Sequence, residues 1–303
     1  MRENNFKLWL QDHIYTPSEL ESYLLCPYRF YAESFLKLEA DSELEVELSP
    51  SEIGSLLHRV LEKILKSSEP TCERAMSLLE QEITERSPAH PQWIPALVEN
   101  QKKKIALTIT AFLEDDAEER KKARSLQPRF MEWSFGKKSD PLVLTHEGKQ
   151  VRLAGRVDRI DVDEEAKRFL VIDYKTGSTK ITGNQIRSGA SLQLPLYIWA
   201  VQKLLLPDYE PVGGLYYSLW DMSKKDGILH ADRLPPFLEI HPRSSSLIPA
   251  AQWKIVFQSL RQKVFEIVAK IEKEEFPTLA PDVWEPCEAY CPYQDICRMR
   301  SVT

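Results

Sequence analysis

Two strand-like segments near the middle of the chain end on charged residues that could bind a metal ion. The segment "VIDYKTGS" (171–178) carries Asp173 and Lys175, which share one face because side chains alternate across a strand. Burying a lone carboxylate is costly, so Asp173 needs a partner. A diagonal ion pair between these two residues at a sheet edge is one interpretation, and it stays open at this point.

A second acid on the preceding strand favours a different interpretation. Asp158, in "GRVDRID", lies roughly opposite Asp173 if "DEEAK" forms the hairpin turn between the two segments. Two adjacent carboxylates repel, and one of them takes up a proton unless a cation holds both. Oxygen ligands suit Mg²⁺ or Mn²⁺. The pattern therefore predicts a divalent metal site.

Three further polar residues could complete such a site. His58 lies at the margin of an apolar helical stripe, where a histidine is often structural, but two nearby acids make it a candidate third ligand. Gln193 and Tyr197 are four residues apart on a helical segment and share a face. They are either a helix edge that meets solvent or a pair of hydrogen-bonding groups near a phosphate.

The cysteines are distributed unevenly along the chain. Three of the five lie in the short C-terminal stretch "CEAYCPYQDIC". In a chain without a visible secretory signal, such a cluster indicates metal or cluster ligation before disulfides, and buried free thiols are the alternative. The five are Cys26, Cys72, Cys287, Cys291 and Cys297.

The elements that must position these residues alternate between helical and strand patterns. Capping boxes begin helices at Thr16 and Ser49, and the first of these helices should end near Cys26 because Pro27 follows it. The predicted elements are a helical insertion over 68–125, a meander of three strands or more from the alternating segments 129–135, 149–162 and 168–175, a helix from about Leu192, a strand over 213–220, a loop with one strand over 223–250 and a long helix over 249–276. This order predicts an α/β fold, with a mixed sheet flanked by helices.

Composition narrows the class of protein. The chain has 303 residues, 43% of them apolar and 28% charged, which is typical of a globular protein with a sizeable core. Its apolar runs are too short for a membrane span and no secretory signal is visible, so a cytoplasmic location without membrane contact is expected. The net charge of −6 means that any phosphate-binding surface must be a local patch.

Taken together and in this order, the motifs resemble the PD-(D/E)XK nuclease superfamily. "GRVDRID", "DYKTG" and "QLPLY" carry the likeness, and "GSLLHRVLE" resembles the histidine motif of the RecB-like exonuclease branch. "CPYRFY" and the C-terminal cysteines are similar to iron–sulfur members of that branch, which include the AddB-type nuclease domain and the CRISPR-adaptation nucleases. The resemblance runs from about Thr16 to Arg298 and implies one restriction-endonuclease-like domain over 1–303, with a cluster-binding tail at 280–303 packing on the N-terminal helix.

The resemblance also implies roles for the candidate residues. Asp158, Asp173, His58 and the Tyr174 carbonyl would hold Mg²⁺ or Mn²⁺. Lys175 would orient or help to deprotonate the attacking water, and Gln193 and Tyr197 would help to position DNA. Glu132, in "MEWSF", resembles an upstream acid of RecB-like domains.

A [4Fe–4S] cluster is the second cofactor that the resemblance implies, with Cys26, Cys287, Cys291 and Cys297 as ligands. The spacing between Cys287 and Cys291 is one residue longer than the family's usual Cys-x-x-Cys. The implied activity is metal-dependent exonucleolytic cleavage of DNA in repair and recombination, alongside a helicase subunit. A non-catalytic DNA-binding scaffold and a zinc-stapled protein of other function are the alternatives.

Overall fold

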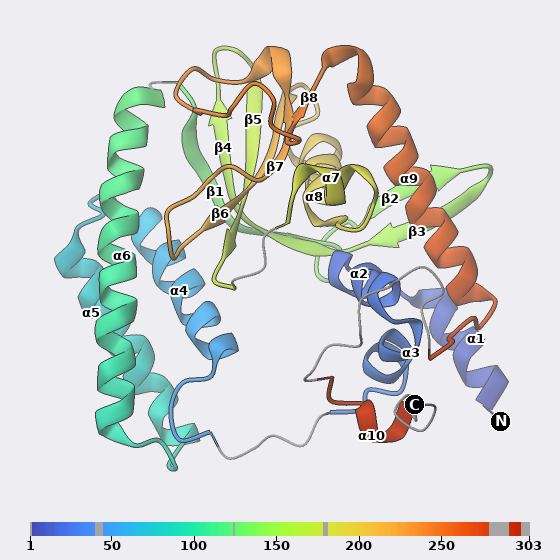
Figure 1. The fold of residues 1–303 in the computed structure, drawn as a ribbon, viewed down its shortest axis with the longest axis horizontal. Helices are drawn as coiled ribbons and strands as arrows, with labels where there is room; N and C mark the ends of the chain where they lie inside the picture. Colours follow the sequence, from blue (N-terminus) through green and yellow to red (C-terminus); the bar gives the residue numbers. More distant parts are fainter. Residues whose placement is uncertain (1, 40–44, 124, 178–180, 279–290, 298–303) are drawn as a thin grey trace.

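The structure is a computed structural model that describes residues 2–39, 45–123, 125–177, 181–278 and 291–297. At its centre is a six-stranded mixed sheet with the strand order β1-β4-β5-β6-β7-β8 (Figure 1). Strands β5 and β6 pair in parallel, as do β7 and β8, and the other neighbours are antiparallel. The strands of this sheet are β1 (Gln127–Phe135), β4 (Gly155–Asp163), β5 (Arg168–Lys175), β6 (Glu210–Ser218), β7 (Gly227–His230) and β8 (Leu247–Ile248).

The predicted hairpin between the two acid-bearing strands is present. Strands β4 and β5 pair antiparallel with Arg159 opposite Ile172 and Asp163 opposite Arg168. Continuing this register by one residue sets Asp158 opposite Asp173, as the turn position predicted. The meander has more than three strands, because the segment over 149–162 divides at Ala154 into β3 (Lys149–Leu153) and β4.

The break at Ala154 has a local cause. Strand β3 pairs with β2 (Leu142–His146) in a separate two-stranded sheet, and the amide of Ala154 donates to the carbonyl of Tyr15 instead. Gly136 has a φ of 97° and approaches Ala154 so closely that a Cβ on Gly136 would lie 2.3 Å from the Ala154 Cβ. The chain therefore turns out of one sheet and into the other at this point.

The predicted helices are present, but the sequence patterns did not predict the first helix or the short ones at 27–30, 183–187 and 294–297. Both capping boxes form, at Thr16 and Ser49. Residues 223–250 contain two short strands rather than one. The helices are α1 (Arg2–Asp12), α2 (Pro17–Leu25), α3 (Pro27–Phe30), α4 (Pro50–Leu65), α5 (Cys72–Arg86), α6 (Pro95–Ala123), α7 (Gly183–Arg187), α8 (Gln193–Ala200), α9 (Ala250–Glu272) and α10 (Gln294–Cys297).

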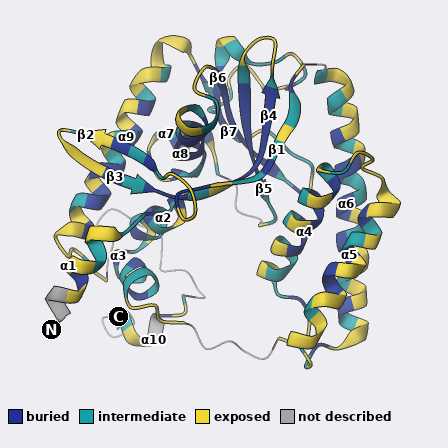
Figure 2. Ribbon diagram, turned by 180° about the vertical axis from the view of Figure 1, so that it is seen from behind, coloured by how far each residue is buried: buried dark blue, intermediate teal, exposed yellow. Residues whose placement is uncertain are grey.

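Helices cover both faces of the sheet, and the buried residues form two apolar clusters (Figure 2). Residues of α4, α5 and α6 pack on one face, whereas α2, α8 and α9 contribute to the cluster on the other face. Alternation along β5 supplies both clusters, since Val171 belongs to one and Ile172 to the other. None of the described helices is both long and apolar enough to cross a bilayer.

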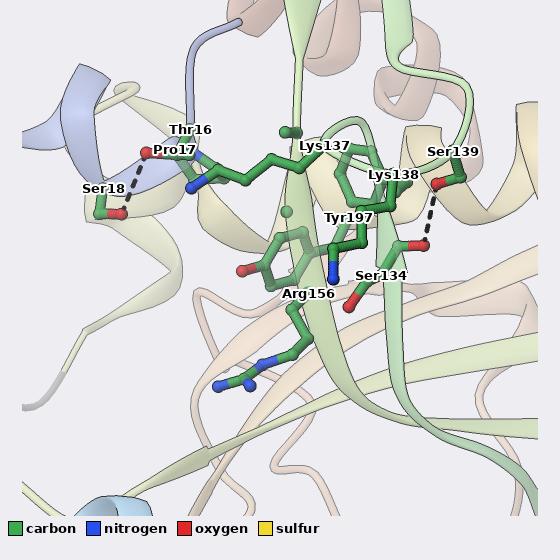
Figure 3. A pocket seen from close by; sticks show the side chains of 12 residues that line it. Thr16, Pro17, Ser18, Ser134, Lys137, Lys138, Ser139, Arg156 and Tyr197 are labelled. Atoms are coloured by element: carbon green, nitrogen blue, oxygen red, sulfur yellow. Dashed lines mark hydrogen bonds between the residues drawn. The ribbon is translucent and has the colours of Figure 1, made fainter.

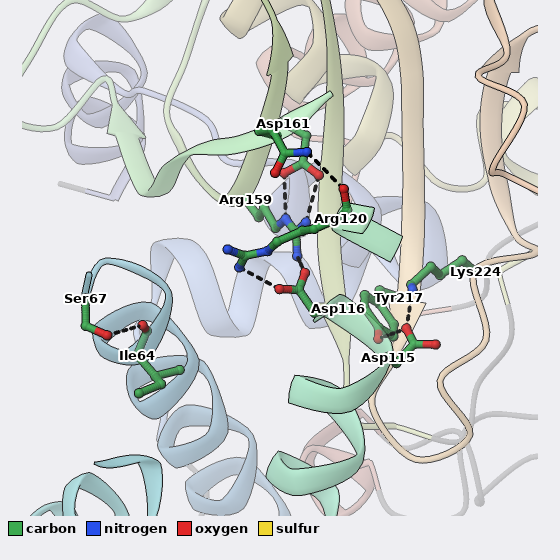
Figure 4. Close-up of polar contacts among 10 residues, drawn as sticks. Ile64, Ser67, Asp115, Asp116, Arg120, Arg159, Asp161, Tyr217 and Lys224 are labelled. Carbon is green, nitrogen blue, oxygen red and sulfur yellow. Dashed lines mark hydrogen bonds and ion pairs between the residues drawn. The ribbon is translucent and has the colours of Figure 1, made fainter. Parts of the chain in front are cut away.

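Buried ion pairs attach α6 to the sheet (Figure 4). The guanidinium of Arg159 on β4 donates from Nε and Nη2 to the two carboxylate oxygens of Asp161, at 2.6 and 2.8 Å. The same guanidinium contacts Asp116 on α6, whose other oxygen pairs with Arg120. Because a lone buried charge is costly, these partners depend on one another.

Candidate metal and phosphodiester site

One helix and two strands bring three possible metal ligands together. His58 Nδ1 lies 3.3 Å from Asp158 Oδ1 and 3.5 Å from Glu132 Oε1. One ligand atom from each of these residues lies within 4.8 Å of the other two. The other oxygen of Asp158 accepts the amide N–H of Tyr174 at 2.8 Å. Two carboxylates and an imidazole form a donor set that suits a divalent ion such as Mn²⁺ or Mg²⁺.

Glu132 reaches this cluster through an unusual backbone conformation. It has a φ of 53° in the middle of β1, in the left-handed region that side chains other than glycine rarely adopt. The neighbours on either side, Met131 and Trp133, pair with Arg159 and Val157, so Glu132 faces Asp158 in the register. Its other carboxylate oxygen forms an ion pair with Arg156, 2.7 Å from Nε. Local strain of this kind is characteristic of functional sites.

Asp173 lies beside this cluster in a second set of contacts. Lys175 Nζ is 2.7 Å from Asp173 Oδ2, and Gln193 Nε2 donates to Asp173 Oδ1 at 2.7 Å. The Gln193 side chain also accepts from Lys175 Nζ at 2.8 Å and approaches the Tyr197 hydroxyl at 3.4 Å. The structure thus contains the ion pair between Asp173 and Lys175. The pair is not isolated at a sheet edge, because Gln193 of α8 is hydrogen-bonded to both residues.

The electrostatics show that the two groups of residues interact. Burial, followed by the charge of Asp158, raises the pKa of Asp173 to about 7, although Lys175 opposes the shift. Burial alone would lower the pKa of His58, but its hydrogen bonds to Asp158 and Glu132 outweigh this and raise the pKa to about 10. In this form the imidazolium supplies the positive charge between the acids that a metal ion would otherwise supply.

The tyrosine hydroxyl of the site stays neutral. Burial, with a contribution from the charge of Asp173, raises the pKa of Tyr197 above its usual range. Its side chain is 6% exposed, so the face of α8 that carries Gln193 and Tyr197 is not a solvent edge. The ring of Tyr174 points away from Asp173 and packs against Phe112 and Tyr217. The Tyr174 carbonyl stays a predicted metal ligand.

A residue that the sequence analysis did not identify holds α8 in place. Glu21 Oε1, on α2, accepts the amide N–H groups of Leu192 at 2.6 Å and Gln193 at 3.0 Å. It also accepts the Ser191 hydroxyl at 3.1 Å. A carboxylate at a helix N-terminus satisfies unpaired amides and complements the helix dipole. No local signal in "SELESYLL" predicts a contact with a helix so distant in the sequence.

Of the four cysteines that the structure describes, Cys26 and Cys297 lie in segments that come together, whereas Cys72 is exposed at the start of α5. Cys26 separates α2 from α3, and its Sγ accepts the amide of Arg29 at 3.4 Å. Helix α10, which ends at Cys297, lies beside α3 in both views (Figures 1 and 2), and the Tyr293 hydroxyl donates to the Leu38 carbonyl at 2.8 Å. Cys26, Cys291 and Cys297 are half-buried, and Cys287 lies outside the described residues. A cluster held by these thiols stays a prediction.

The fold and the site define a class of protein. A mixed sheet flanked by helices, with acids and a lysine at the ends of adjacent central strands, is the restriction-endonuclease-like arrangement. The family model of the PD-(D/E)XK nuclease superfamily matches residues 15–298. The chain belongs to this superfamily, and its curated relatives place it in the RecB-like branch.

Two of these relatives share one description, that of a subunit of an ATP-dependent helicase/deoxyribonuclease. The protein of Caldanaerobacter subterraneus subsp. tengcongensis is 24% identical over 97% of this chain and 30% of its own length. That of Moorella thermoacetica is 30% identical over 67% of this chain and 19% of its own length. The chain therefore spans about a fifth to a third of these relatives. The solved structure of SSO0001 aligns over 80% of this chain and 95% of its own, with a TM-score of 0.30 and 16% identity.

Proposed function

We propose that the protein is a metal-dependent DNA exonuclease that hydrolyses phosphodiester bonds at DNA ends during repair and recombination. The observation that carries the proposal is the cluster of His58, Glu132 and Asp158 beside the Asp173–Lys175 pair. The relatives named as deoxyribonuclease subunits support DNA as the substrate and a helicase subunit as a partner.

The donor set fits a divalent ion. Two carboxylates and an imidazole would hold it, with Asp173 and the Tyr174 carbonyl as further candidate ligands. A bound Mg²⁺ or Mn²⁺ ion lowers the pKa of its water and polarises the phosphate. Asp158 and Asp173 are 7% and 2% exposed, so their charges need a cation close by.

The residues around the cluster have separate tasks. Lys175 is fixed by Asp173 and Gln193, and its ammonium presents positive charge where negative charge develops on the phosphate oxygens. Tyr197 keeps its proton and can donate a hydrogen bond. Gln193 donates to Asp173 and accepts from Lys175, so it keeps these side chains in fixed orientations.

End-labelled linear DNA and closed circular DNA, with Mn²⁺ or with EDTA, test the proposal. The wild type should release label from linear DNA only when the metal is present. Asp173→Asn and Lys175→Met should lower the rate by about 10²–10⁴-fold with the fold retained. Lys121→Met, on the exposed end of α6, is the matched control. Binding without cleavage by the wild type would support the scaffold alternative, and degradation that persists in both site variants would refute the assignment of the site.

A [4Fe–4S] cluster held by Cys26, Cys287, Cys291 and Cys297 is the second part of the proposal. It would join the segment around α3 to the C-terminal segment, which supports a structural task. Purified protein should be brown, with absorbance near ~400 nm from thiolate-ligated iron. A colourless sample that contains zinc would support the zinc-stapled alternative instead.

A further inference from the structure

A pocket of about 640 Å³ opens beside the proposed metal site (Figure 3). The start of α2, the end of β1 with the turn that follows it, the start of β4 and one residue of α8 form its walls. Its lining residues are Thr16, Pro17, Ser18, Ser134, Phe135, Lys137, Lys138, Ser139, Ala154, Gly155, Arg156 and Tyr197.

All the charged side chains that line this pocket are positive. Lys137, Lys138 and Arg156 contribute these side chains, and no acidic residue is among the lining residues that the structure describes. This imbalance stands out in a chain whose net charge is −6. Both lysines are exposed, and within the described ranges neither forms an ion pair or a hydrogen bond. The pocket therefore presents uncompensated positive charge together with serine hydroxyls, which is a surface suited to a phosphate.

Two of the lining residues also belong to the proposed metal site. Arg156 is two residues before Asp158 on β4, a span of roughly 6.6 Å along a strand. Its Nε forms an ion pair with Glu132, while 64% of its side chain stays exposed. The Tyr197 hydroxyl reaches Gln193, which in turn binds Asp173. A ligand in the pocket is therefore a near neighbour of a group bound at the metal site.

The remaining walls contribute shape rather than charge. Thr16 is engaged in its capping box with Glu19, so the start of α2 is not the source of the positive charge. Gly155 lies in the floor, where a Cβ would come within 2.8 Å of the Tyr197 ring and 2.9 Å of the Phe135 ring. The absence of a side chain at this position lets the rings and the backbone form a closed floor.

We infer that this pocket binds a backbone phosphate of the DNA strand whose neighbouring phosphodiester occupies the metal site. Lys137 and Lys138 provide the charge, and Arg156 couples the pocket to Glu132 and so to the metal ligands. The inference rests on the proposed function and adds the location of a second contact with the strand. Because phosphate contacts carry no sequence information, this contact strengthens binding to any sequence equally.

The salt dependence of DNA binding tests the inference separately from cleavage. Binding of a fluorescent single-stranded oligonucleotide is measured by anisotropy in EDTA, from low to moderate salt. Each phosphate contact that is lost lowers the slope of log K against log[salt] by about 0.7 for single strands. The magnitude of the slope for the double variant Lys137→Gln/Lys138→Gln should therefore be smaller by about 0.7, whichever oligonucleotide sequence is used. The control Lys121→Gln/Lys122→Gln removes the same charge from an exposed pair on α6 and should keep the wild-type slope.

Each outcome of this experiment decides the inference. A smaller slope in the pocket variant alone supports it, even if the wild type proves unable to cleave DNA, so a failure of the nuclease proposal is seen separately. Equal slopes for the two double variants overturn it, and so does a wild type that binds no DNA. Thermal melting of both variants shows that the fold is retained, and Mn²⁺ titration of the pocket variant should give the wild-type affinity.

Discussion

Metal binding should release protons from the site, in a number that depends on pH. With a pKa of about 10, His58 is protonated at neutral pH in the metal-free protein, and an imidazolium cannot bind a metal. Asp173, with a pKa of about 7, is half protonated there and should ionise next to a bound cation. We expect about one proton released per Mn²⁺ ion at pH 8 and about two at pH 6.

The affinity for the metal follows from these numbers. Displacing the His58 proton costs about 3 kcal/mol at pH 8 and about 5 kcal/mol at pH 6, from roughly 1.4 kcal/mol per pH unit. Displacing the Asp173 proton adds about one further factor of ten to this pH dependence. The affinity for Mn²⁺ should therefore fall roughly 10³-fold from pH 8 to pH 6. Titration calorimetry with Mn²⁺ in two buffers of different ionisation enthalpy counts the protons. The His58→Gln variant should release about one proton fewer per Mn²⁺ ion than the wild type. A wild type that releases no protons at pH 8 would refute this account.

Three further perturbations address the positions of the site residues and the stability of the fold. Glu21→Ala leaves three donors at the start of α8 without their acceptor, so it should lower the free energy of unfolding by about 2–3 kcal/mol in urea denaturation, whereas Glu21→Gln should cost less. Arg159→Met leaves the buried carboxylate of Asp161 without its ion-pair partner and should cost about 3–5 kcal/mol, against no measurable loss for Lys121→Met. Because the pKa of His58 is raised, its contribution to stability is complete below about pH 6.5 and is lost as pH rises through about 10. In EDTA the wild type should therefore lose more stability than His58→Gln between pH 7 and pH 10, and parallel curves would contradict this.

Local patterns were sufficient to predict the elements that carry most of the site. Turn residues between two alternating segments predicted the register that sets Asp158 opposite Asp173, and the capping box at Ser49 located the helix of His58. The four-residue spacing of Gln193 and Tyr197 predicted their shared face. In each case the prediction depends on the geometry of one helix or one hairpin, which nearby residues determine.

Contacts that depend on distant parts of the chain could not be predicted in the same way. Alternation along β1 does not indicate that Glu132 takes a positive φ and turns toward His58, and only its resemblance to a family acid suggested a role. Asp116 lies in a helix with many charges, most of which face solvent, so nothing marks it as the partner of Arg159. The contact of Glu21 with α8 likewise requires the tertiary fold.

The buried ion pairs behind the sheet bear directly on the geometry of the site. Asp158 and Arg159 are consecutive in β4, so their side chains leave the strand on opposite sides. Asp158 contacts His58, while Arg159 is fixed by Asp161 and by Asp116 of α6. Apolar residues of similar volume could replace such a network without loss of stability, yet they would not fix the strand at one position along α6. We therefore expect the ion pairs to support the proposed metal site by holding β4 in register, because the carboxylate of Asp158 keeps its distance to His58 only while the strand does not slide along α6.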